Sequence, residues 1–425
     1  MLCPLTEHIG SSGEPLSLAA YTQLGGYEAA KKALAIEPSS ITKLILDSGL
    51  RGRGGAGFST GFKMGAVPLN MPCPKYLVAN ADEMEPGCFK DRWLLEGNPH
   101  QLIEGMIIAA FAIQADTAYI FLRGEYTRAH KIMEKALAEA YDQAILGKDI
   151  LGSTYNLKLY LHKSAGRYIC GEETALLNAL EGRRATPRSK PPYPQTSGLW
   201  GRPTLIQNVE TLSNMPHIVK HGAAWFHSLS KGEDAGTKIF GVSGKVKRPG
   251  AWELPLGTTM REILEVHAGG MRDGYKFRAL LPGGASTEFM LEKQLDTPMD
   301  YSSMAKLSTF MGTGTMIVLD DRTCPIGMML NLERFFKQES CGFCTPCRDG
   351  LAWVVDILSA IENGDGHPDD VPILLQHAQL LKPGSTFCPL APGASMPLRS
   401  GLTYFAEEFA SHFRTKRCPY ADHLH

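Results

Sequence analysis

A regular alternation of strand-like and helix-like segments between residues 75 and 181 constrains the fold of this chain more than any other feature of its sequence. The strand-like segments are rich in β-branched and aromatic residues, whereas the helix-like segments carry apolar residues at helical intervals. Because strands joined through helices pair in parallel, the alternation predicts an α/β fold, a Rossmann-like domain with a helix-covered parallel sheet. We expect strands at residues 75–79, 117–124 and 156–162, and helices at residues 100–113, 128–146 and 172–181.

Two further domains are expected downstream of this sheet. From about Thr237 the order strand, strand, helix, strand indicates a small ubiquitin-like (β-grasp) domain. From Gly327 onward, amphipathic segments with short links predict a C-terminal four-helix bundle, with helices at 328–339, 351–364, 371–384 and 402–417. We therefore divide the chain into an N-terminal segment with a glycine-rich loop (1–60), the α/β domain (61–228), the β-grasp domain (229–323) and the helical bundle (324–425).

The composition of the chain excludes several classes of protein. Its 425 residues include 43 basic and 44 acidic side chains, so no global charge recruits nucleic acid or an anionic membrane. The most apolar run, residues 105–113, is too short to span a bilayer. Because the first residues lack the basic and apolar parts of a secretory signal, we expect the cysteines to stay reduced and to be candidate ligands.

Three cysteines in the spacing C-x-x-C-x-x-C and one remote cysteine form the most specific motif. Cys341, Cys344 and Cys347 lie at the junction of two expected helices, and Cys388 follows the third helix. Three thiolates at this spacing with a remote fourth match the ligands of a [4Fe–4S] cluster. Zinc would favour two separated C-x-x-C pairs, and a thioredoxin-like redox pair needs only two cysteines. The other cysteines lack such spacing and are expected to be packing residues: Cys3, Cys73, Cys88, Cys170, Cys324 and Cys418.

A glycine-rich loop, LRGRGGAGF at residues 50–58, places Gly52, Gly54 and Gly57 in the G-x-G-x-x-G spacing associated with dinucleotide binding. A dinucleotide fingerprint follows a strand, but here the preceding segment, residues 41–50, is helical in pattern. The segment is therefore either a plain surface loop or a place where backbone N–H groups approach a phosphate or a flat ring.

Polar segments follow two expected strands, at the sheet edge where parallel sheets bind ligands. The first, NADEMEPG at 80–87, is either a solvated acidic loop, a cation site, or a set of acceptors for flavin N–H and ribose hydroxyl groups. The second, residues 166–174, places backbone N–H groups at a helix start, which favours anionic or polar ligand atoms. The stiff basic loop at 183–194 is either an exposed turn or a wall for a phosphorylated, aromatic ligand.

Taken together and in order, six motifs resemble those of the NADH-oxidising, flavin-binding F subunits of bacterial NADH:quinone oxidoreductase, the respiratory complex I. The likeness extends from about Gly25 to Glu408. It implies that FMN binds to the parallel-sheet domain, that NADH is the substrate, that one [4Fe–4S] cluster lies in the bundle, and that the domain between them is of SLBB type. The motifs are GRGGAGF, NADEMEPG, GRYICGEETAL, RSKPPYP, NVETL and SCGFCTPCRDG.

The resemblance also implies roles for individual residues. Hydride passes from NADH to FMN directly, so no catalytic side chain is expected. Cys341, Cys344, Cys347 and Cys388 would bind the cluster. NADH would stack on the exposed flavin face, close to Phe58, Glu85, Glu173, Lys190 and Tyr193. FMN would be bound by Gly52, Arg53, Gly54, Gly55, Lys63, Asn80, Asp82, Glu83, Tyr168, Gly171, Glu172, Glu173, Asn208 and Thr211.

Two positions depart from the family pattern. Gln207 stands where the family usually has asparagine, so it is left out of the expected FMN set. Met64 stands where an aromatic residue commonly follows the flavin-loop lysine, which would loosen one wall of the NADH pocket.

An electron that leaves the cluster needs an acceptor, and the sequence contains no second centre. By resemblance, the acceptors are a thioredoxin-like [2Fe–2S] subunit and a large iron–sulfur subunit of the peripheral arm. The chain is then expected on the cytoplasmic side of the bacterial inner membrane, within a membrane-bound complex and without a span or a nucleic-acid partner. The nearest alternative is the diaphorase subunit of a soluble NAD-linked hydrogenase or formate dehydrogenase. We also consider a cluster-bearing interaction protein with a decayed flavin site, and a zinc-dependent binding module.

Overall fold

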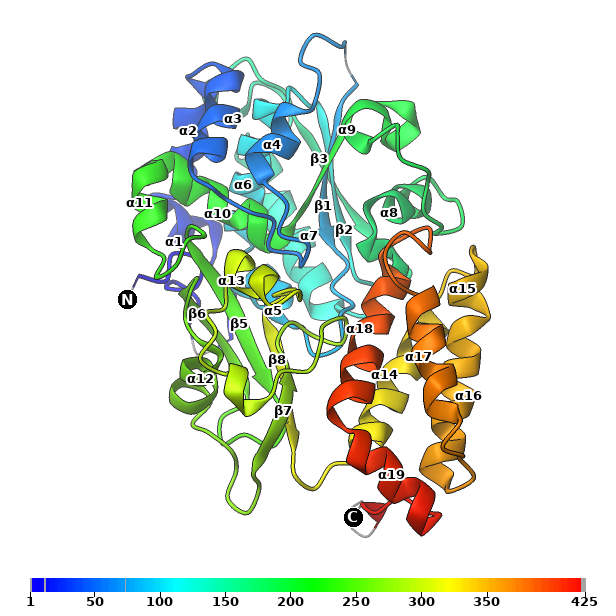
Figure 1. The fold of residues 1–425 in the computed structure, drawn as a ribbon. Coiled ribbons are helices and arrows are strands. Elements are labelled where there is room, and N and C mark those ends of the chain that lie inside the picture. Colours follow the sequence, from blue (N-terminus) through cyan, green and yellow to red (C-terminus); the bar gives the residue numbers. More distant parts are fainter. Residues whose placement is uncertain (1, 11–12, 73, 422–425) are drawn as a thin grey trace.

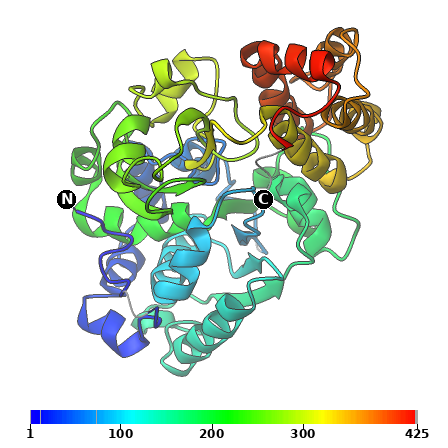
Figure 2. The ribbon, with the colours of Figure 1, turned by 90° about the horizontal axis from the view of Figure 1, so that it is seen from below.

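The structure of the protein is a computed structural model that describes residues 2–10, 13–72 and 74–421. It has three packed parts, which are an α/β region around a parallel sheet, a region around a mixed sheet, and a C-terminal helical bundle (Figure 1). The bundle lies beside the mixed-sheet region, and the N-terminal helices lie on the side of the α/β region that faces away from the bundle (Figure 2). Cys73, expected as a packing residue, lies outside the described residues.

The parallel sheet has four strands in the order β3-β2-β1-β4, and every neighbouring pair is parallel. Its strands confirm the predicted parallel arrangement and include all three strands that the alternation predicts. The fourth strand is not predicted, because its five residues follow a long loop rich in glycine and proline. The strands are β1 (Tyr76–Ala81), β2 (Thr117–Leu122), β3 (Lys158–Lys163) and β4 (Thr204–Asn208).

Side chains of β1 alternate between two hydrophobic cores, as side chains of a strand do. Leu77 belongs to a core that is shared with α6 (Pro99–Ala112) and α10 (Val209–His221). Val78 belongs to a second core that includes α8 (Glu173–Leu180) and the helical bundle. One face of the sheet is therefore covered by helices of its own region, and the other face is packed toward the bundle.

The mixed sheet has the strand order β6-β5-β8-β7, in which β5 and β8 are parallel and the two outer pairs are antiparallel. A short helix, α12 (Met260–Glu262), continues into a π-helical turn at Ile263–His267, where the sequence predicts one helix. The eighth strand is not predicted from the sequence. The strands are β5 (Thr237–Ser243), β6 (Gly250–Pro255), β7 (Phe277–Leu281) and β8 (Thr315–Asp320).

The C-terminal region is helical, as predicted, but its last expected helix has different bounds. The segment 402–417 is divided at Phe405, and the preceding helix already begins at Leu390. Its two glycines and two prolines are atypical of a helix, so the sequence does not predict its first part. No helix in the described part of the chain has the length and apolar character that a membrane crossing requires. The main helices are α14 (Pro325–Glu339), α16 (Gly350–Asn363), α17 (Asp370–Leu380), α18 (Leu390–Tyr404) and α19 (Ala406–Thr415).

The remaining helices are short or cover the α/β region. The segments 41–50, 128–146 and 172–181 that the sequence predicts as helical correspond to α3, α7 and α8. The further helices are α1 (Leu18–Gln23), α2 (Glu28–Leu34), α3 (Pro38–Asp47), α4 (Thr60–Gly65), α5 (Lys90–Gly97), α7 (Thr127–Asp142), α9 (Pro194–Ser197), α11 (Ala223–Ser228), α13 (Tyr301–Lys306) and α15 (Thr345–Arg348), with 3₁₀ turns η1 (Ile150–Gly152), η2 (Tyr168–Gly171), η3 (Leu199–Gly201) and η5 (Glu292–Gln294).

Candidate functional site

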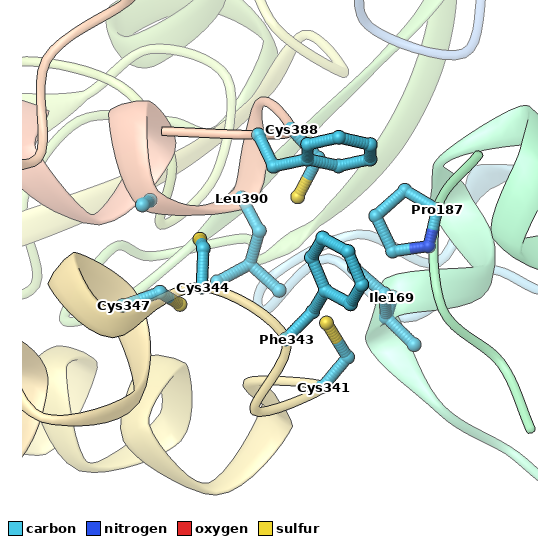
Figure 3. Close-up of a pocket in the computed structure, with 10 residues that line it drawn as sticks. Ile169, Pro187, Cys341, Phe343, Cys344, Cys347, Cys388 and Leu390 are labelled. Atoms are coloured by element: carbon cyan, nitrogen blue, oxygen red, sulfur yellow. The ribbon is translucent and has the colours of Figure 1, made fainter. Parts of the chain in front are cut away.

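Four cysteines from two separate segments line one pocket at the end of the bundle that faces the α/β region (Figure 3). Cys341, Cys344 and Cys347 lie in the turn between α14 and α15 and in α15 itself, and Cys388 lies two residues before the start of α18. Ile169 of η2 lines the same pocket. The structure therefore brings together all four cysteines that the sequence predicts as cluster ligands.

The electrostatics of these thiols fit a shared metal cluster. Burial, and to a smaller extent the neighbouring thiols of Cys344 and Cys341, raise the pKa of Cys347 to about 11, although a hydrogen bond with Ser340 opposes the rise. Burial likewise raises the pKa of Cys388 to about 12, with added repulsion from Cys341 and Cys347. Thiolates held this close to one another require a compensating positive charge, which iron ions provide.

Two aromatic rings cover the cysteine pocket. The ring centroids of Phe343 and Phe387 are 4.8 Å apart, and both residues line the pocket. Each ring is also partly open to solvent. These rings therefore border the cysteine pocket and also reach the surface of the protein.

The glycine-rich loop lies between α3 and α4 and packs onto the end of β4. The backbone N–H of Arg53 donates to Oγ1 of Thr211 in the first turn of α10 at 2.8 Å. A Cβ atom on Gly54 would lie 3.1 Å from Cβ of Asn208. This arrangement agrees with the expectation that the loop follows a helix and is not the start of a dinucleotide fingerprint.

The carboxyl ends of β1 and β4 bring Asn80 and Asn208 side by side in the sheet register. The Nδ2 of Asn80 donates to the carbonyl of Cys170 at 3.4 Å, so the second predicted polar segment meets the first. A Cβ atom on Gly171 would meet no atom within 4 Å. Polar backbone and side-chain groups thus border open space beside Gly171.

Two buried polar atoms near this sheet edge have no hydrogen-bond partner within the described chain, Oδ1 of Asp82 and Nε2 of Gln207. Oδ2 of Asp82 accepts a hydrogen bond from Ser164 at 2.8 Å. Burial raises the pKa of the Asp82 carboxyl to about 7, although the Ser164 hydrogen bond opposes the rise. Buried polar atoms are normally paired, so these two fit a polar ligand such as the flavin ring.

A chain of ion pairs connects α4, the helix after the glycine loop, to the start of α8. Nζ of Lys63 lies 2.6 Å from Oε2 of Glu173, and Nζ of Lys190 lies 3.0 Å from Oε1 of the same residue. Burial opposes ionisation, but both lysines lower the pKa of the Glu173 carboxyl. Glu172 pairs with Lys190 at 2.9 Å and also accepts hydrogen bonds from the first backbone N–H groups of α8.

The other two acidic candidates are held by protein groups. Oε1 of Glu83 accepts from the N–H of Asp91 at 3.0 Å, and its Oε2 accepts from Tyr126 at 2.9 Å, so this carboxylate caps the start of α5. Glu85 accepts hydrogen bonds from the hydroxyl of Tyr168 at 2.6 Å and from the backbone N–H of Ser286 at 2.7 Å. Burial raises the pKa of Glu85, whereas these hydrogen bonds lower it.

Aromatic side chains expected near NADH are at the surface. Phe58 is 55% exposed and Tyr193 is 56% exposed, which suits residues that contact an incoming ring. Phe62, which the sequence does not single out, is also exposed, and its ring lies 5.8 Å from that of Phe58. Met64 is buried in the hydrophobic core of the α/β region. Its thioether therefore does not form an exposed wall.

A buried charge network lies beneath the glycine loop, and the sequence motifs did not reveal it. Glu210 of α10 pairs with Lys90 at 2.8 Å and with Lys238 of β5 at 3.1 Å. Burial opposes ionisation, but the two lysines lower the pKa of Glu210 to about 2. Nζ of Lys238 also donates to the carbonyl of Arg53 at 3.3 Å. The network couples the mixed sheet to the loop. Glu210 lies in the NVETL motif, but Lys90 and Lys238 belong to none of the motifs, so the sequence could not predict their pairing with it.

The fold and the two sites define a class, the flavin- and iron–sulfur-binding oxidoreductase subunits. Residues 45–217 match the family model of the Nuo51 FMN-binding domain, and residues 327–412 match the NADH-ubiquinone oxidoreductase-F iron-sulfur binding region. These matches confirm the prediction of FMN and one [4Fe–4S] cluster. The SLBB domain model matches residues 239–289. The chain belongs to the family of NADH-quinone oxidoreductase F subunits, which confirms the resemblance and the NADH dehydrogenase class.

Curated relatives with this name are similar over nearly their whole length. The F subunits of Salmonella typhimurium and Escherichia coli are each 53% identical over 96% of this chain and 92% of theirs. The F subunit of Streptomyces coelicolor is 42% identical over 99% of this chain and 93% of its own. Because these relatives are named as subunits of NADH-quinone oxidoreductase and the chain belongs to their family, the chain is part of a complex.

A solved structure of an NAD⁺-reducing [NiFe]-hydrogenase chain has a TM-score of 0.83 and 34% identity, and the match covers 96% of this chain and 67% of that one. The alternative of a soluble diaphorase subunit therefore rests on a more distant relative than the F subunits.

Proposed function

We propose that this subunit takes hydride from NADH onto FMN and passes single electrons to its [4Fe–4S] cluster and on toward quinone. One observation carries the proposal: η2 takes part in both candidate sites. Ile169 lines the cysteine pocket, and two residues later Gly171 borders the open space beside Asn80. With FMN and the cluster bound at these sites, a single turn of backbone would separate them, which suits electron transfer between them.

The FMN site is proposed at the carboxyl ends of β1 and β4, beneath the glycine loop. The unpartnered Asp82 oxygen and the open face of Gly171 support a flat polar ligand there. When bound, FMN accepts the two electrons of a hydride together and releases them singly. The residues proposed to bind it are Gly52, Arg53, Gly54, Gly55, Lys63, Asn80, Asp82, Glu83, Tyr168, Gly171, Glu172, Glu173, Asn208 and Thr211. The carboxylate of Glu83 is already engaged at α5, so we expect its role to be positional.

NADH is proposed to enter over the exposed rings of Phe58 and Tyr193, with Glu85, Glu173 and Lys190 beside it. The chain's own residues then have three tasks, which are to orient the nicotinamide, to exclude water and to hold charge near the phosphates. Lys190 is paired with two glutamates, so it can turn toward a phosphate only by giving up these contacts. Specific anion binding therefore competes with an existing ion pair, which disfavours unrelated anions.

Cys341, Cys344, Cys347 and Cys388 are proposed as the four cluster ligands, because they share one pocket. The domain bounds proposed from the sequence are 1–60, 61–228, 229–323 and 324–425. The mixed sheet is proposed to be of β-grasp type, which its central parallel pair, flanking antiparallel strands and single helical turn support.

The proposed partners are a thioredoxin-like [2Fe–2S] subunit and a large iron–sulfur subunit of the peripheral arm, on the cytoplasmic side of the membrane. The bundle exposes Phe343, whose ring lines the cluster pocket, and Trp353 of α16, and such exposed rings suit contacts with partner subunits. Affinity purification of the tagged chain from its own cells tests this, because the bound subunits can be identified directly.

Activity is tested separately from assembly. The purified protein should contain FMN and cluster iron and should reduce ferricyanide with NADH. Recovery of hydrogenase subunits in the affinity purification would support the soluble diaphorase instead. A protein without flavin and without NADH–ferricyanide activity would overturn the proposed function altogether.

A further inference from the structure

A second cluster of metal-binding side chains lies in the bundle, away from the cysteine pocket. Cys324, Glu362, His412 and Cys418 each offer one ligand atom, and these four atoms all lie within 4.8 Å of one another. Cys324 caps the start of α14, Glu362 lies near the end of α16, His412 lies in α19 and Cys418 follows that helix. The fold thus gathers residues that are far apart in the sequence.

The separations match those of ligands around one ion. Sγ of Cys324 lies 3.2 Å from Oε2 of Glu362 and 3.5 Å from Nε2 of His412. The same imidazole nitrogen lies 3.3 Å from the Glu362 oxygen. In tetrahedral zinc sites, metal–ligand bonds of about 2.0 to 2.3 Å place neighbouring ligand atoms roughly 3.3 to 3.8 Å apart. The Cys418 thiol contacts both Glu362 and Cys324, which closes the group.

Backbone groups hydrogen-bond to two of these side chains and orient them, as the hydrogen-bond partners of metal ligands do. Nδ1 of His412 lies 2.7 Å from the backbone carbonyl oxygen of Glu408, so Nδ1 carries the proton. The lone pair of Nε2 is then directed at the other three ligand atoms. The backbone N–H of Gly327 donates to Sγ of Cys324 at 3.3 Å, a contact that favours a thiolate. Cys324, His412 and Cys418 are all buried, so little water competes for them.

We propose that Cys324, Glu362, His412 and Cys418 bind a structural Zn²⁺ ion. Two sulfur donors and one imidazole favour zinc over the hard cations Mg²⁺ and Ca²⁺, which prefer oxygen ligands. Four protein ligands leave no open position for water or substrate, which is the arrangement of structural zinc sites. The spacing of the two cysteines gave no reason to expect them as ligands.

The zinc site and the cysteine pocket lie at opposite ends of α14. Cys324 precedes the helix and Cys341 follows it, and 15 helical residues extend about 22 Å. In Figure 1 the C-terminal helix α19 lies at the lower end of the bundle, and α15 lies at its upper end. The ion would tie the starts and ends of three helices together, and so hold α14 and α16 in the register that presents the cluster ligands.

Metal analysis of the intact protein, purified with its FMN and cluster, tests the proposal. We expect one zinc per chain in addition to the cluster iron, and a zinc K-edge X-ray absorption spectrum with two sulfur and two lighter neighbours. Zinc that had replaced iron in the cysteine pocket would instead show four sulfur neighbours. That result, or a protein without zinc that takes up none from added zinc chloride, would overturn the proposal.

Two variants separate the sites. Cys418→Ser should lose zinc and keep iron and FMN, whereas Cys388→Ser should lose iron and keep zinc. Cys3→Ser, which changes a cysteine outside both groups, should keep both metals. Because Cys418→Ser could unfold the bundle, the helix content of this variant is measured by circular dichroism. The zinc K-edge X-ray absorption spectrum of the unmodified protein tests the zinc site independently of any variant. Zinc retained in a folded Cys418→Ser variant, or a disulfide between Cys324 and Cys418 in non-reducing mass spectrometry, would also contradict the site.

Discussion

Nζ of Lys63 lies 2.6 Å from Oε2 of Glu173, and this ion pair joins the helix after the glycine loop to the first turn of α8. The same lysine donates to the carbonyl of Ile206 on β4 at 2.8 Å. One side chain therefore holds together the loop, the strand end and the helix start that surround the proposed flavin site. Partial burial of both partners makes the pair stronger than a surface ion pair.

Replacing Lys63 with alanine should weaken FMN binding without unfolding the protein. Glu173 would keep only Lys190 as a partner, and its partly compensated charge would repel the flavin phosphate. Loss of a charged hydrogen bond costs about 1.5 to 3 kcal/mol, so we expect the FMN affinity to fall about tenfold or more. The ratio of FMN to protein after gel filtration measures this.

The matched control is Lys131→Ala, which removes an exposed lysine of α7. It should keep the FMN content of the unmodified protein. An unchanged FMN content in the Lys63→Ala variant would remove this lysine from the proposed flavin site.

Gly171→Ala should separate flavin binding from folding. The added Cβ would meet no protein atom within 4 Å and so should leave the melting temperature almost unchanged. If the open space beside it is the flavin site, the methyl group should lower the FMN content strongly. Gly350→Ala, whose Cβ would have only an ordinary contact 3.7 Å from His377, is the control and should lose neither stability nor flavin. Full FMN retention in Gly171→Ala would move the flavin away from η2.

Gly57→Ala should instead damage the fold of the loop. Gly57 has φ +64°, and a Cβ there would lie 2.3 Å from the ring of Tyr301. The ring is buried between the loop and the mixed sheet, so it has little room to move. We expect a melting temperature several degrees lower, consistent with a cost of about 1 to 3 kcal/mol. A melting temperature equal to that of the unmodified protein would show that the loop can shift away from Tyr301.

Much of this architecture is predictable from the sequence, because periodicity reports local structure. The alternation of segments predicts the parallel sheet, and the C-x-x-C-x-x-C motif predicts ligands that are already close along the chain. Contacts between distant residues leave no such trace. Ser286, in the mixed-sheet region, donates a hydrogen bond to Glu85, and no motif near Ser286 in the sequence predicts this contact. The same is true of Glu362 and His412, which only the packing of the bundle brings together.

β4 shows a different limit of sequence-based prediction. It is the edge strand that pairs with β1, yet it is short and follows a loop that contains only the short elements α9 and η3 after α8. A search for alternating strands and helices therefore passes over it. Because β4 is missing from the prediction, the sequence does not show that Asn208 lies beside Asn80, which the register of β1 and β4 explains.

Glu253 is expected to make the stability of the protein fall as the pH rises. This buried carboxyl of β6 accepts hydrogen bonds from the backbone N–H groups of Leu5 and Thr6 at 3.0 and 2.9 Å, and from Thr237 at 2.6 Å. Burial nevertheless raises its pKa to about 7. Because the folded pKa is above the unfolded value of about 4.3, its contribution to stability is complete below pH 4 and is lost as the pH rises through 7.

The Glu253→Gln variant cannot ionise at this position, so it should not share this loss. Between pH 5 and pH 8 the free energy of unfolding of the unmodified protein should fall relative to the variant by up to about 3 kcal/mol. Paired melting curves at each pH isolate the effect, since all other titrating groups are common to both proteins. Glu407→Gln, which changes an exposed carboxyl on α19, is the matched control. A difference for Glu253→Gln that stays constant with pH would mean that the N-terminal donors keep this carboxylate ionised throughout the range.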